Sequence, residues 1–331
     1  MAEAPQVRCP HCDSRIDYEE LYAETGEHAD ATCPSCHNIV PDPSVLQVER
    51  RYRLTDVGAE EAAGWQAQQA RRPRIRVVLL CAIQDELNQV RRQMEIHGEI
   101  GLVSGADGAV YLEGSFAGLH VDWQIRAAAT SQTNAAAAAA TVGAAMDYQP
   151  AMIIFVGIAG SLKQSVALGD IVVADRVHDY EVGKAAEEYQ ERHLQHQSSF
   201  QLTRWAEAVA TTDSWQEKIC VYDPGLMSGP KVHVAPIAAG SKVVANKDSH
   251  TFGLIGRAAP RAVAVEMEGA GVLLGVHRMG NTEGLVVRGI SDEVEGKEES
   301  DEEGWRHQAA ANAVAFVYEL LYQYQPSPQR D

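Results

Sequence analysis

From residue 75 onward the chain alternates short, continuous apolar runs with longer segments of helical periodicity. The run IRVVLLCAI at 75–83 is flanked by charge, as expected for a parallel strand buried on both faces. Further strand-like runs lie at 119–130, 151–160, 170–180, 231–238, 261–268 and 284–291, and helical patterns at 134–147, 198–211, 269–280 and 304–325. This alternation predicts an α/β domain over 75–325, with a mixed, mostly parallel central sheet flanked by helices.

Polar and glycine residues follow several of these strands. The first strand runs into Gln84-Asp85-Glu86, another into Glu266-Met267-Glu268, and the last into Ser291-Asp292. Taken singly, Glu268 could cap the next helix and Asp292 could simply end a strand. Ligands of such sheets bind beyond the carboxyl ends of the strands. Burying a carboxylate costs free energy, so acidic residues at the ends of apolar strands are either solvated or used in chemistry. The joint occurrence of polar residues at several strand ends therefore predicts a ligand-binding site.

Four of the six cysteines lie before residue 40 as two C-x2-C pairs: Cys9, Cys12, Cys33 and Cys36. This pattern is typical of four thiolates around a structural zinc ion. We expect a zinc ribbon over 1–47, with the metal supplying the folding free energy of this short segment. Disulfides, or haem attachment at 33–37, are the alternatives, and both are less favoured because the chain starts without a secretory signal.

Two segments lie outside the predicted domains: a connector is expected over 48–74 and a tail over 326–331.

The charge of the chain limits its partners. The formal net charge of -18 makes nucleic acid an unlikely partner but permits a small nucleotide. Acidic residues around the cysteines favour a protein or oligomer contact there over DNA. With no apolar stretch long enough to cross a membrane, we expect a cytoplasmic protein.

Four ordered motifs resemble those of a known superfamily. They are AIQDEL (82–87), VGIAGSL (156–162) with LGDIVVAD (168–175), VAVEMEG (263–269) and VVRGISDE (286–293). In this order they resemble the nucleoside phosphorylase and methylthioadenosine/adenosylhomocysteine nucleosidase superfamily, over residues 75–325. The resemblance implies a phosphorylase/hydrolase-like fold and cleavage of an N-glycosidic bond.

The resemblance also implies roles for single residues. Asp292 would protonate the departing purine, and Ser291 would orient the carboxyl of Asp292. Glu86 would hold the attacking water. Glu268 would bind ribose hydroxyls, with Met267 on the sugar face. Further substrate-binding positions implied are Gly157, Ala159, Gly160, Val244, Glu266 and Arg288. The chemistry fits, because bond cleavage needs one protonated and one ionised carboxyl in different environments.

Water is the favoured nucleophile, because the arginine and serine that cradle phosphate in the phosphorylases are missing around Gly157 and after the first strand. No cofactor is expected for catalysis. Residues 180–193 and the segment from 289 resemble a bacterial nucleosidase subgroup associated with antiviral defence, some members of which cleave ATP. Candidate phosphate-binding residues are Lys163, Lys184, Arg192 and Lys247.

Several readings remain open. The substrate would be a purine nucleoside or nucleotide such as AMP or ATP, or methylthioadenosine or adenosylhomocysteine in salvage. A purine nucleoside phosphorylase is another alternative. A nucleotide-sensing module, with the zinc ribbon docking a protein partner, is the non-catalytic one. The resemblance further implies a homo-oligomer.

Overall fold

The computed structural model describes residues 72–184, 190–220, 229–244, 246–294 and 304–326, and four short strands before them. The chain divides into two compact units, 1–71 and 72–331. In the first, β1 (Gln6–Arg8) pairs antiparallel with β2 (Arg15–Asp17), and β3 (Ala31–Thr32) with β4 (Ile39–Val40). The predicted zinc ligands Cys9, Cys12, Cys33 and Cys36 lie outside the described residues.

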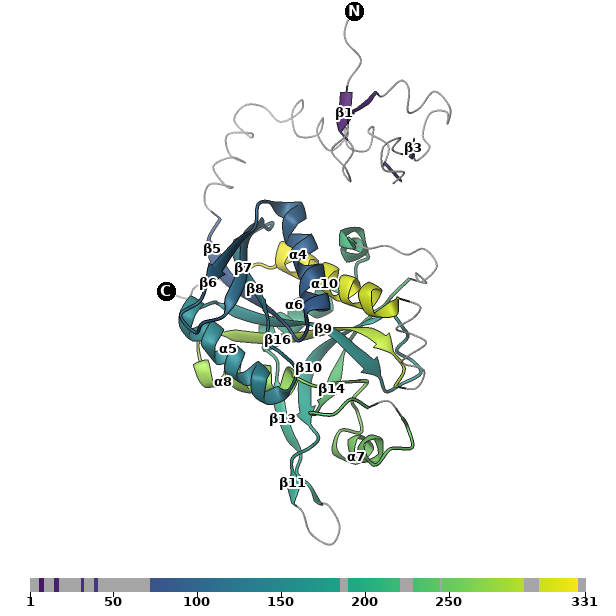
Figure 1. The fold of residues 1–331 in the computed structure, drawn as a ribbon. Helices are drawn as coiled ribbons and strands as arrows, with labels where there is room; N and C mark the ends of the chain where they lie inside the picture. The colour runs from purple at the N-terminus through teal and green to yellow at the C-terminus, as the bar shows by residue number, and fades with distance from the viewer. Residues whose placement is uncertain are drawn as a thin grey trace, which may run out of the picture. The chain divides into compact units, whose positions relative to one another are not determined.

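A ten-stranded sheet forms the centre of the second unit (Figure 1). Its strands are β5 (Arg74–Cys81), β6 (Gly101–Ser104), β7 (Val110–Ala117), β8 (Asp122–Ala129), β9 (Met152–Ser161), β10 (Ile171–Asp179), β13 (Leu194–Gln197), β14 (Val232–Ala239), β15 (Ala264–Glu266) and β16 (Glu283–Asp292). Two further strands, β11 (Gly183–Lys184) and β12 (Gln190–Glu191), form a separate hairpin.

The sheet is mixed rather than mostly parallel. Among its described strand pairs, five are parallel and five antiparallel. The strands β9, β16, β10, β14 and β15 close a ring, because each pairs with the next and β15 returns to β9. In this ring β10, β14 and β15 run opposite to β9 and β16. Apolar periodicity reveals that a strand is buried but not its direction, so the prediction of a mostly parallel sheet was wrong in this respect.

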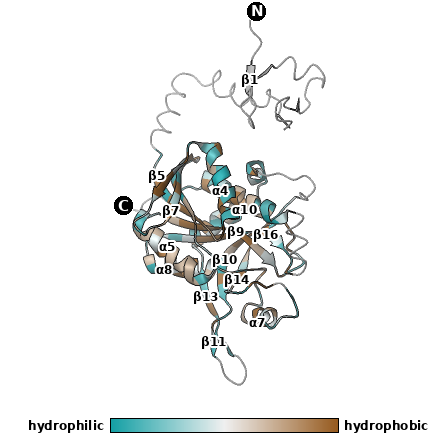
Figure 2. Cartoon of the chain, in the orientation of Figure 1, coloured by the Kyte–Doolittle hydropathy of each residue, from teal (hydrophilic) through white to brown (hydrophobic). Residues whose placement is uncertain are grey.

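Helices cover both faces of the sheet, as predicted. On one side lie α4 (Gln84–His97), α6 (Phe200–Val209), the short 3-10 helix η1 (Ser214–Lys218) and α10 (Trp305–Gln323), and on the other α5 (Asn134–Tyr148) and α8 (Gly269–Met279). Residues of β9 alternate between the two cores: Ile154 and Val156 face one, Ile153 and Phe155 the other. Figure 2 shows the resulting apolar strands inside and a polar outer side on α4.

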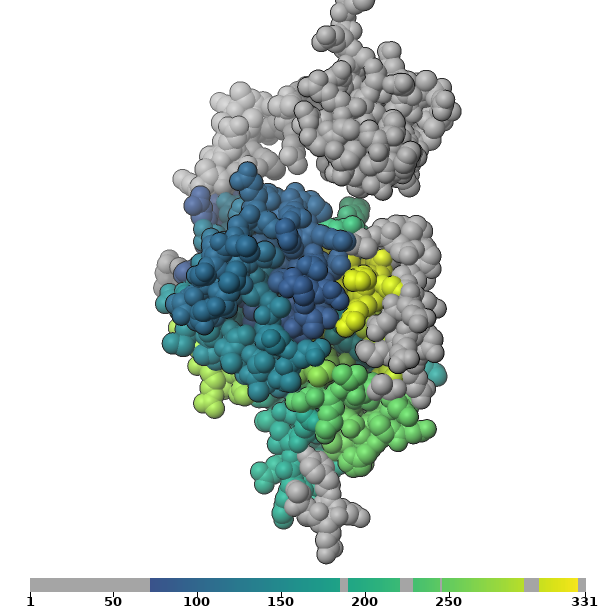
Figure 3. Space-filling model, viewed as in Figure 1, coloured from purple at the N-terminus to yellow at the C-terminus, as the bar shows by residue number. Residues whose placement is uncertain are grey.

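The peripheral elements complete the unit. In Figure 3, α4 and α10 lie side by side at the surface, and α7 (His250–Ala258) belongs to a separate lobe. The helix α7 has its own small core with Val244 and Val265. The sequence patterns did not identify α4, α7 or the β6–β7 pair. None of the described helices is long and apolar enough to cross a membrane.

Candidate active site

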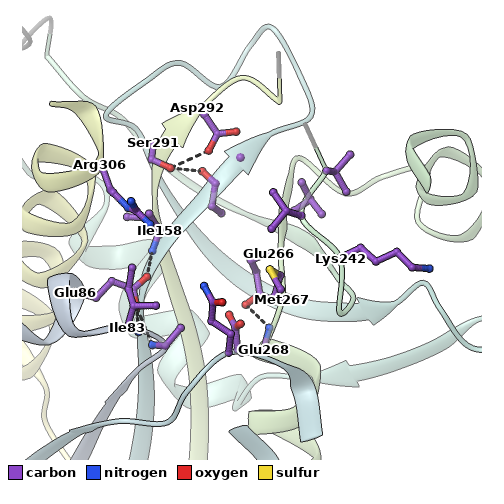
Figure 4. Close-up of a pocket in the computed structure, with 17 residues that line it drawn as sticks. Ile83, Glu86, Ile158, Lys242, Glu266, Met267, Glu268, Ser291, Asp292 and Arg306 are labelled. Carbon is purple, nitrogen blue, oxygen red and sulfur yellow. Dashed lines mark hydrogen bonds between the residues drawn. The ribbon is translucent and has the colours of Figure 1, made fainter. Parts of the chain in front are cut away.

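A pocket of about 140 Å³ lies where the ends of β5, β9, β15 and β16 meet. Nine residues selected from the sequence line it: Glu86, Ala159, Gly160, Val244, Glu266, Met267, Glu268, Ser291 and Asp292. Figure 4 shows Asp292 and Ser291 on one side and Glu266 and Glu268 on another, with Glu86 on a third. Strand tips far apart in the sequence therefore converge, as expected.

The register of β15 explains how its carboxylates reach this point. The strand runs antiparallel to β9, with Val265 opposite Gly160, while on the other side of β9 Asp292 pairs with Gly160. The segment Glu266-Met267-Glu268 therefore turns back along β9 and away from Asp292. Two carboxylate-bearing strands thus flank one strand of the ring and present their acids to the same pocket.

Glu86 is fixed by backbone donors. Its Oε2 accepts hydrogen bonds from the backbone N–H groups of Ala82 (2.7 Å) and Ile83 (3.1 Å), and its Oε1 from that of Ile158 (2.9 Å). Because Glu86 lies in the first turn of α4, it also satisfies N–H groups that the helix leaves open. Burial raises the pKa of this carboxyl, although Arg288 and the backbone donors oppose the shift.

Arg288 lies fully buried behind the pocket, where its guanidinium forms ion pairs with three glutamates. Its Nη2 donates to Oε2 of Glu266 and lies 3.5 Å from Oε2 of Glu268, and its Nη1 lies 3.7 Å from Oε1 of Glu86. The guanidinium also stacks 4.1 Å from the ring centre of Phe155. Burial lowers its pKa, but the three carboxylates outweigh burial and the net pKa is raised. Within the described chain, its Nε and Nη1 have no hydrogen-bond partner.

Gly157 also lies behind the pocket rather than in its lining. A Cβ atom at this position would overlap both Oε1 of Glu86 and Nη1 of Arg288. Only glycine therefore lets β9 pass this close to the ion pair.

Glu266, the last residue of β15, and Glu268, two residues later, make different contacts. The carboxylate of Glu266 caps α8 by accepting from the backbone N–H groups of Gly269 (2.9 Å) and Glu268 (3.1 Å). Glu268 is the N-cap residue but its side chain makes no capping bond, so the interpretation of Glu268 as a helix cap was wrong. Its Oε1 instead accepts from the backbone N–H of Thr133 (3.1 Å). Burial and the charge of Glu266 raise the pKa of Glu268 to about 7, against the opposing effect of Arg288.

Ser291 and Asp292 end β16 together. The Oγ of Ser291 lies 3.0 Å from Oδ2 of Asp292 and 3.5 Å from the carbonyl oxygen of Ala159. The backbone N–H of Val294 donates to Oδ1 (3.1 Å). The carboxyl of Asp292 is buried and is held from both of its oxygens.

The predicted phosphate-binding residues are placed elsewhere. Lys163, Lys184 and Arg192 are exposed and none lines the pocket; Nζ of Lys163 lies 3.5 Å from the carbonyl oxygen of Pro260. Lys247 does not line it either. The cations in the lining are Lys242 and Arg306, which sequence reasoning missed. Lys242 is paired with Glu181 (2.9 Å) and points away from the pocket in Figure 4.

Most of the other unpredicted lining residues lie beside predicted ones: Ala82, Ile83, Ile158, Val243 and Val265. Gln132 and Arg306 lie outside every motif. Gln132 falls between two non-glycine residues with left-handed backbone, Ser131 (φ 70°) and Thr133 (φ 101°), and Arg306 falls in the first turn of α10. No local pattern marks either of them. The described His, Cys, Asp and Glu residues form no cluster suited to a metal ion.

Comparison with known proteins identifies the family of this chain. A family model described as the phosphorylase superfamily matches residues 76–321. The 5'-methylthioadenosine/S-adenosylhomocysteine nucleosidase of Staphylococcus haemolyticus is 25% identical over 179 residues, covering 53% of this chain and 71% of that protein. The corresponding enzyme of Maridesulfovibrio salexigens is 27% identical over 187 residues, covering 55% and 75%.

Solved structures share the fold. The methylthioadenosine/adenosylhomocysteine nucleosidase of Neisseria meningitidis, in complex with methylthio-immucillin-A, superposes with a TM-score of 0.61 at 24% identity, covering 75% of this chain and 99% of that one. The futalosine hydrolase of Helicobacter pylori gives a TM-score of 0.59 at 19% identity, covering 76% and 98%.

Proposed function

Since the chain belongs to the phosphorylase superfamily and is an N-glycosyl hydrolase, we propose that it releases the base from a purine nucleoside or nucleotide by hydrolysis. The observation that carries this proposal is the convergence of Glu86, Glu268 and Asp292 on one pocket in three different environments. Separate environments let carboxyl groups take different protonation states at one pH.

Asp292 is the proposed general acid. Cleavage leaves electrons on the purine ring, and a proton delivered to a ring nitrogen makes the base a better leaving group. The contact between Ser291 and Oδ2, and the backbone bond to Oδ1, hold this carboxyl in one orientation. Glu268 is the proposed partner of the sugar, where a carboxylate binds hydroxyls and stabilises the positive charge that develops at the anomeric carbon.

Glu86 is the proposed holder of the attacking water. It lines the pocket, and its carboxylate is fixed by the backbone N–H groups of Ala82, Ile83 and Ile158. A water molecule that donates to this carboxylate would be held in a defined position. Arg288 lies behind the lining, with Nη1 3.7 Å from Oε1 of Glu86. Phosphate is disfavoured as nucleophile, because Glu86, Glu266 and Glu268 already surround Arg288 with negative charge.

Adenine release tests the proposal. The protein is incubated with adenosine, methylthioadenosine, AMP and ATP, with and without phosphate, and free adenine is quantified by chromatography. We expect phosphate-independent release that Asp292→Asn lowers by roughly 10²–10⁴-fold, whereas the exposed Asp213→Asn leaves it unchanged. A strict requirement for phosphate would indicate a phosphorylase. No release of base from any substrate would favour a nucleotide sensor.

A second substrate class is supported by the relatives, whose names specify methylthioadenosine and adenosylhomocysteine. The same assay separates that class from nucleotides. Preference for a nucleotide would agree with the antiviral role implied by the sequence resemblance, because the reaction would then destroy a nucleotide pool.

We further propose that Cys9, Cys12, Cys33 and Cys36 bind a structural zinc ion, and that this region contacts a protein partner or a second copy of the chain. Each cysteine pair falls in sequence between two strands that pair antiparallel. Metal analysis should give one zinc per chain, lost in Cys9→Ser/Cys12→Ser.

A further inference from the structure

Arg306 is a cation in the pocket wall whose charge is not paired by any described residue. It lies half-buried in the first turn of α10 and lines the pocket. Within the described ranges it forms no salt bridge, and its Nε is buried without a hydrogen-bond partner. A guanidinium that lines a pocket without a charge partner among the described residues favours a ligand that carries negative charge.

The other cations near the pocket are already engaged. Arg288 lies behind the lining and serves Glu86, Glu266 and Glu268. Lys242 pairs with Glu181 and points out of the pocket, on the opposite side from Arg306 in Figure 4. Arg306 is thus the unpaired cation of the described lining.

The surroundings of Arg306 also favour an anion. The residue is the second of the 19-residue helix α10, whose amino-terminal N–H groups and dipole attract negative charge. A nucleoside alone would offer this guanidinium only weak acceptors. A phosphate offers oxygens that match the planar donor fork of arginine.

The proposed substrate orientation leaves one end for this contact. With the base at Asp292, the hydroxyls at Glu268 and the attacking water at Glu86, the remaining substituent of the sugar is the one on C5'. In Figure 4 Arg306 lies beside Ile158, between Ser291 and Glu86. We propose that Arg306 binds the 5'-phosphate of a purine nucleoside monophosphate, which is the preferred substrate; this inference rests on the proposed hydrolase function.

One phosphate fits better than three. Additional phosphates would need additional cations at the pocket, and Lys163, Lys184 and Arg192 do not line it. Among the described residues, the lining contains one unpaired guanidinium and four carboxyl groups. The acidic pocket therefore disfavours a more highly charged nucleotide.

The test compares kcat/KM for AMP and for adenosine in the wild type and in Arg306→Met, which keeps much of the side-chain length without the charge. We expect the ratio of AMP to adenosine to fall roughly 10- to 100-fold, the usual worth of hydrogen bonds to a charged group. Arg278→Met, at an exposed arginine in the last turn of α8, is the matched control and should leave the ratio unchanged. Thermal unfolding checks that both variants fold.

The outcomes separate this inference from the proposed function. Adenine release that depends on Asp292 but shows an unchanged AMP-to-adenosine ratio in Arg306→Met overturns the phosphate site alone. Equal loss with both substrates assigns Arg306 a structural role and also overturns it. ATP preferred over AMP overturns the assignment of a monophosphate. If no substrate releases base, calorimetric titration with AMP decides: equal affinity of wild type and Arg306→Met refutes the site, and weaker binding by the variant supports it.

Discussion

A Cβ atom on Gly157 would overlap Oε1 of Glu86. The same atom would meet Nη1 of Arg288, so the smallest possible side chain here displaces both the proposed holder of the water, Glu86, and the guanidinium behind it. We predict that Gly157→Ala lowers kcat at least 100-fold and destabilises the fold by about 1–3 kcal/mol, as overpacking does. Steady-state kinetics and urea unfolding measure the two effects.

The control for this substitution is Gly256→Ala in α7, where a Cβ meets nothing within 4 Å. This variant should keep full activity and gain up to about 1 kcal/mol, because alanine favours helix. Normal turnover by Gly157→Ala would contradict the assignment of Glu86 to the water.

Glu268 should set the acid limb of the pH–rate profile. Its pKa is raised to about 7 by burial and by Glu266, so the carboxylate forms only as the pH rises through that value. If the ionised form stabilises the sugar, kcat/KM should increase about tenfold between pH 6 and pH 8. Glu268→Gln should remove this limb along with most activity.

A second variant locates the cause of that limb. Glu266→Gln removes the neighbouring negative charge that helps to raise the pKa, and the limb should move to lower pH. A limb that persists unchanged in Glu268→Gln would belong to another group.

Arg288→Met should destabilise the protein in a pH-dependent way. Removing the cation leaves three buried glutamates uncompensated, which costs about 3–5 kcal/mol in comparable buried pairs. Burial already raises the folded-state pKa values of Glu86 and Glu268 above their unfolded values, and loss of Arg288 raises them further. Such groups favour folding below the unfolded pKa, and that contribution is lost as the pH rises through the folded pKa.

The loss should therefore be larger at pH 8 than at pH 5, measured by urea unfolding. Arg278→Met, whose guanidinium is exposed, should stay within about 0.5 kcal/mol of wild type at both pH values. An equal loss by Arg288→Met at pH 5 and pH 8 would mean that packing on Phe155, not charge, is what Arg288 contributes.

Glu181 positions the segment 241–244, of which residues 242–244 line the pocket. Its Oε2 accepts from the backbone N–H of Ser241 (2.6 Å), and its Oε1 lies 2.9 Å from Nζ of Lys242. We predict that Glu181→Ala raises KM roughly three- to tenfold with a smaller change in kcat, because the substrate wall loosens while the carboxylates stay in place. Lys242→Met keeps the bond to Ser241 and should have a smaller effect on KM. A fall in kcat with unchanged KM would place Glu181 in the chemistry instead.

Much of the fold and of the candidate site could be predicted from the sequence. Apolar runs and helical periodicity located the long strands β5, β8, β9, β10, β14 and β16, together with α5, α6, α8 and α10, because burial on one or both faces leaves a local pattern. The acidic ends of strands also identified Glu86, Glu268 and Asp292, since a carboxylate directly after a buried strand stands out against its neighbours. All three line the pocket.

The sequence by itself thus determined most of the long strands and which acids follow them. Only the tertiary structure decided that β15 runs against β9, that Glu266 rather than Glu268 caps α8, and that Arg288 is buried among three glutamates. It also brought Arg306 to the pocket, through α10 packing so closely on β16 that a Cβ on Gly289 would overlap the carbonyl of Ala309. The physical reason is range: periodicity records how deeply a residue is buried, whereas strand direction and ion pairing depend on contacts between segments far apart in the chain.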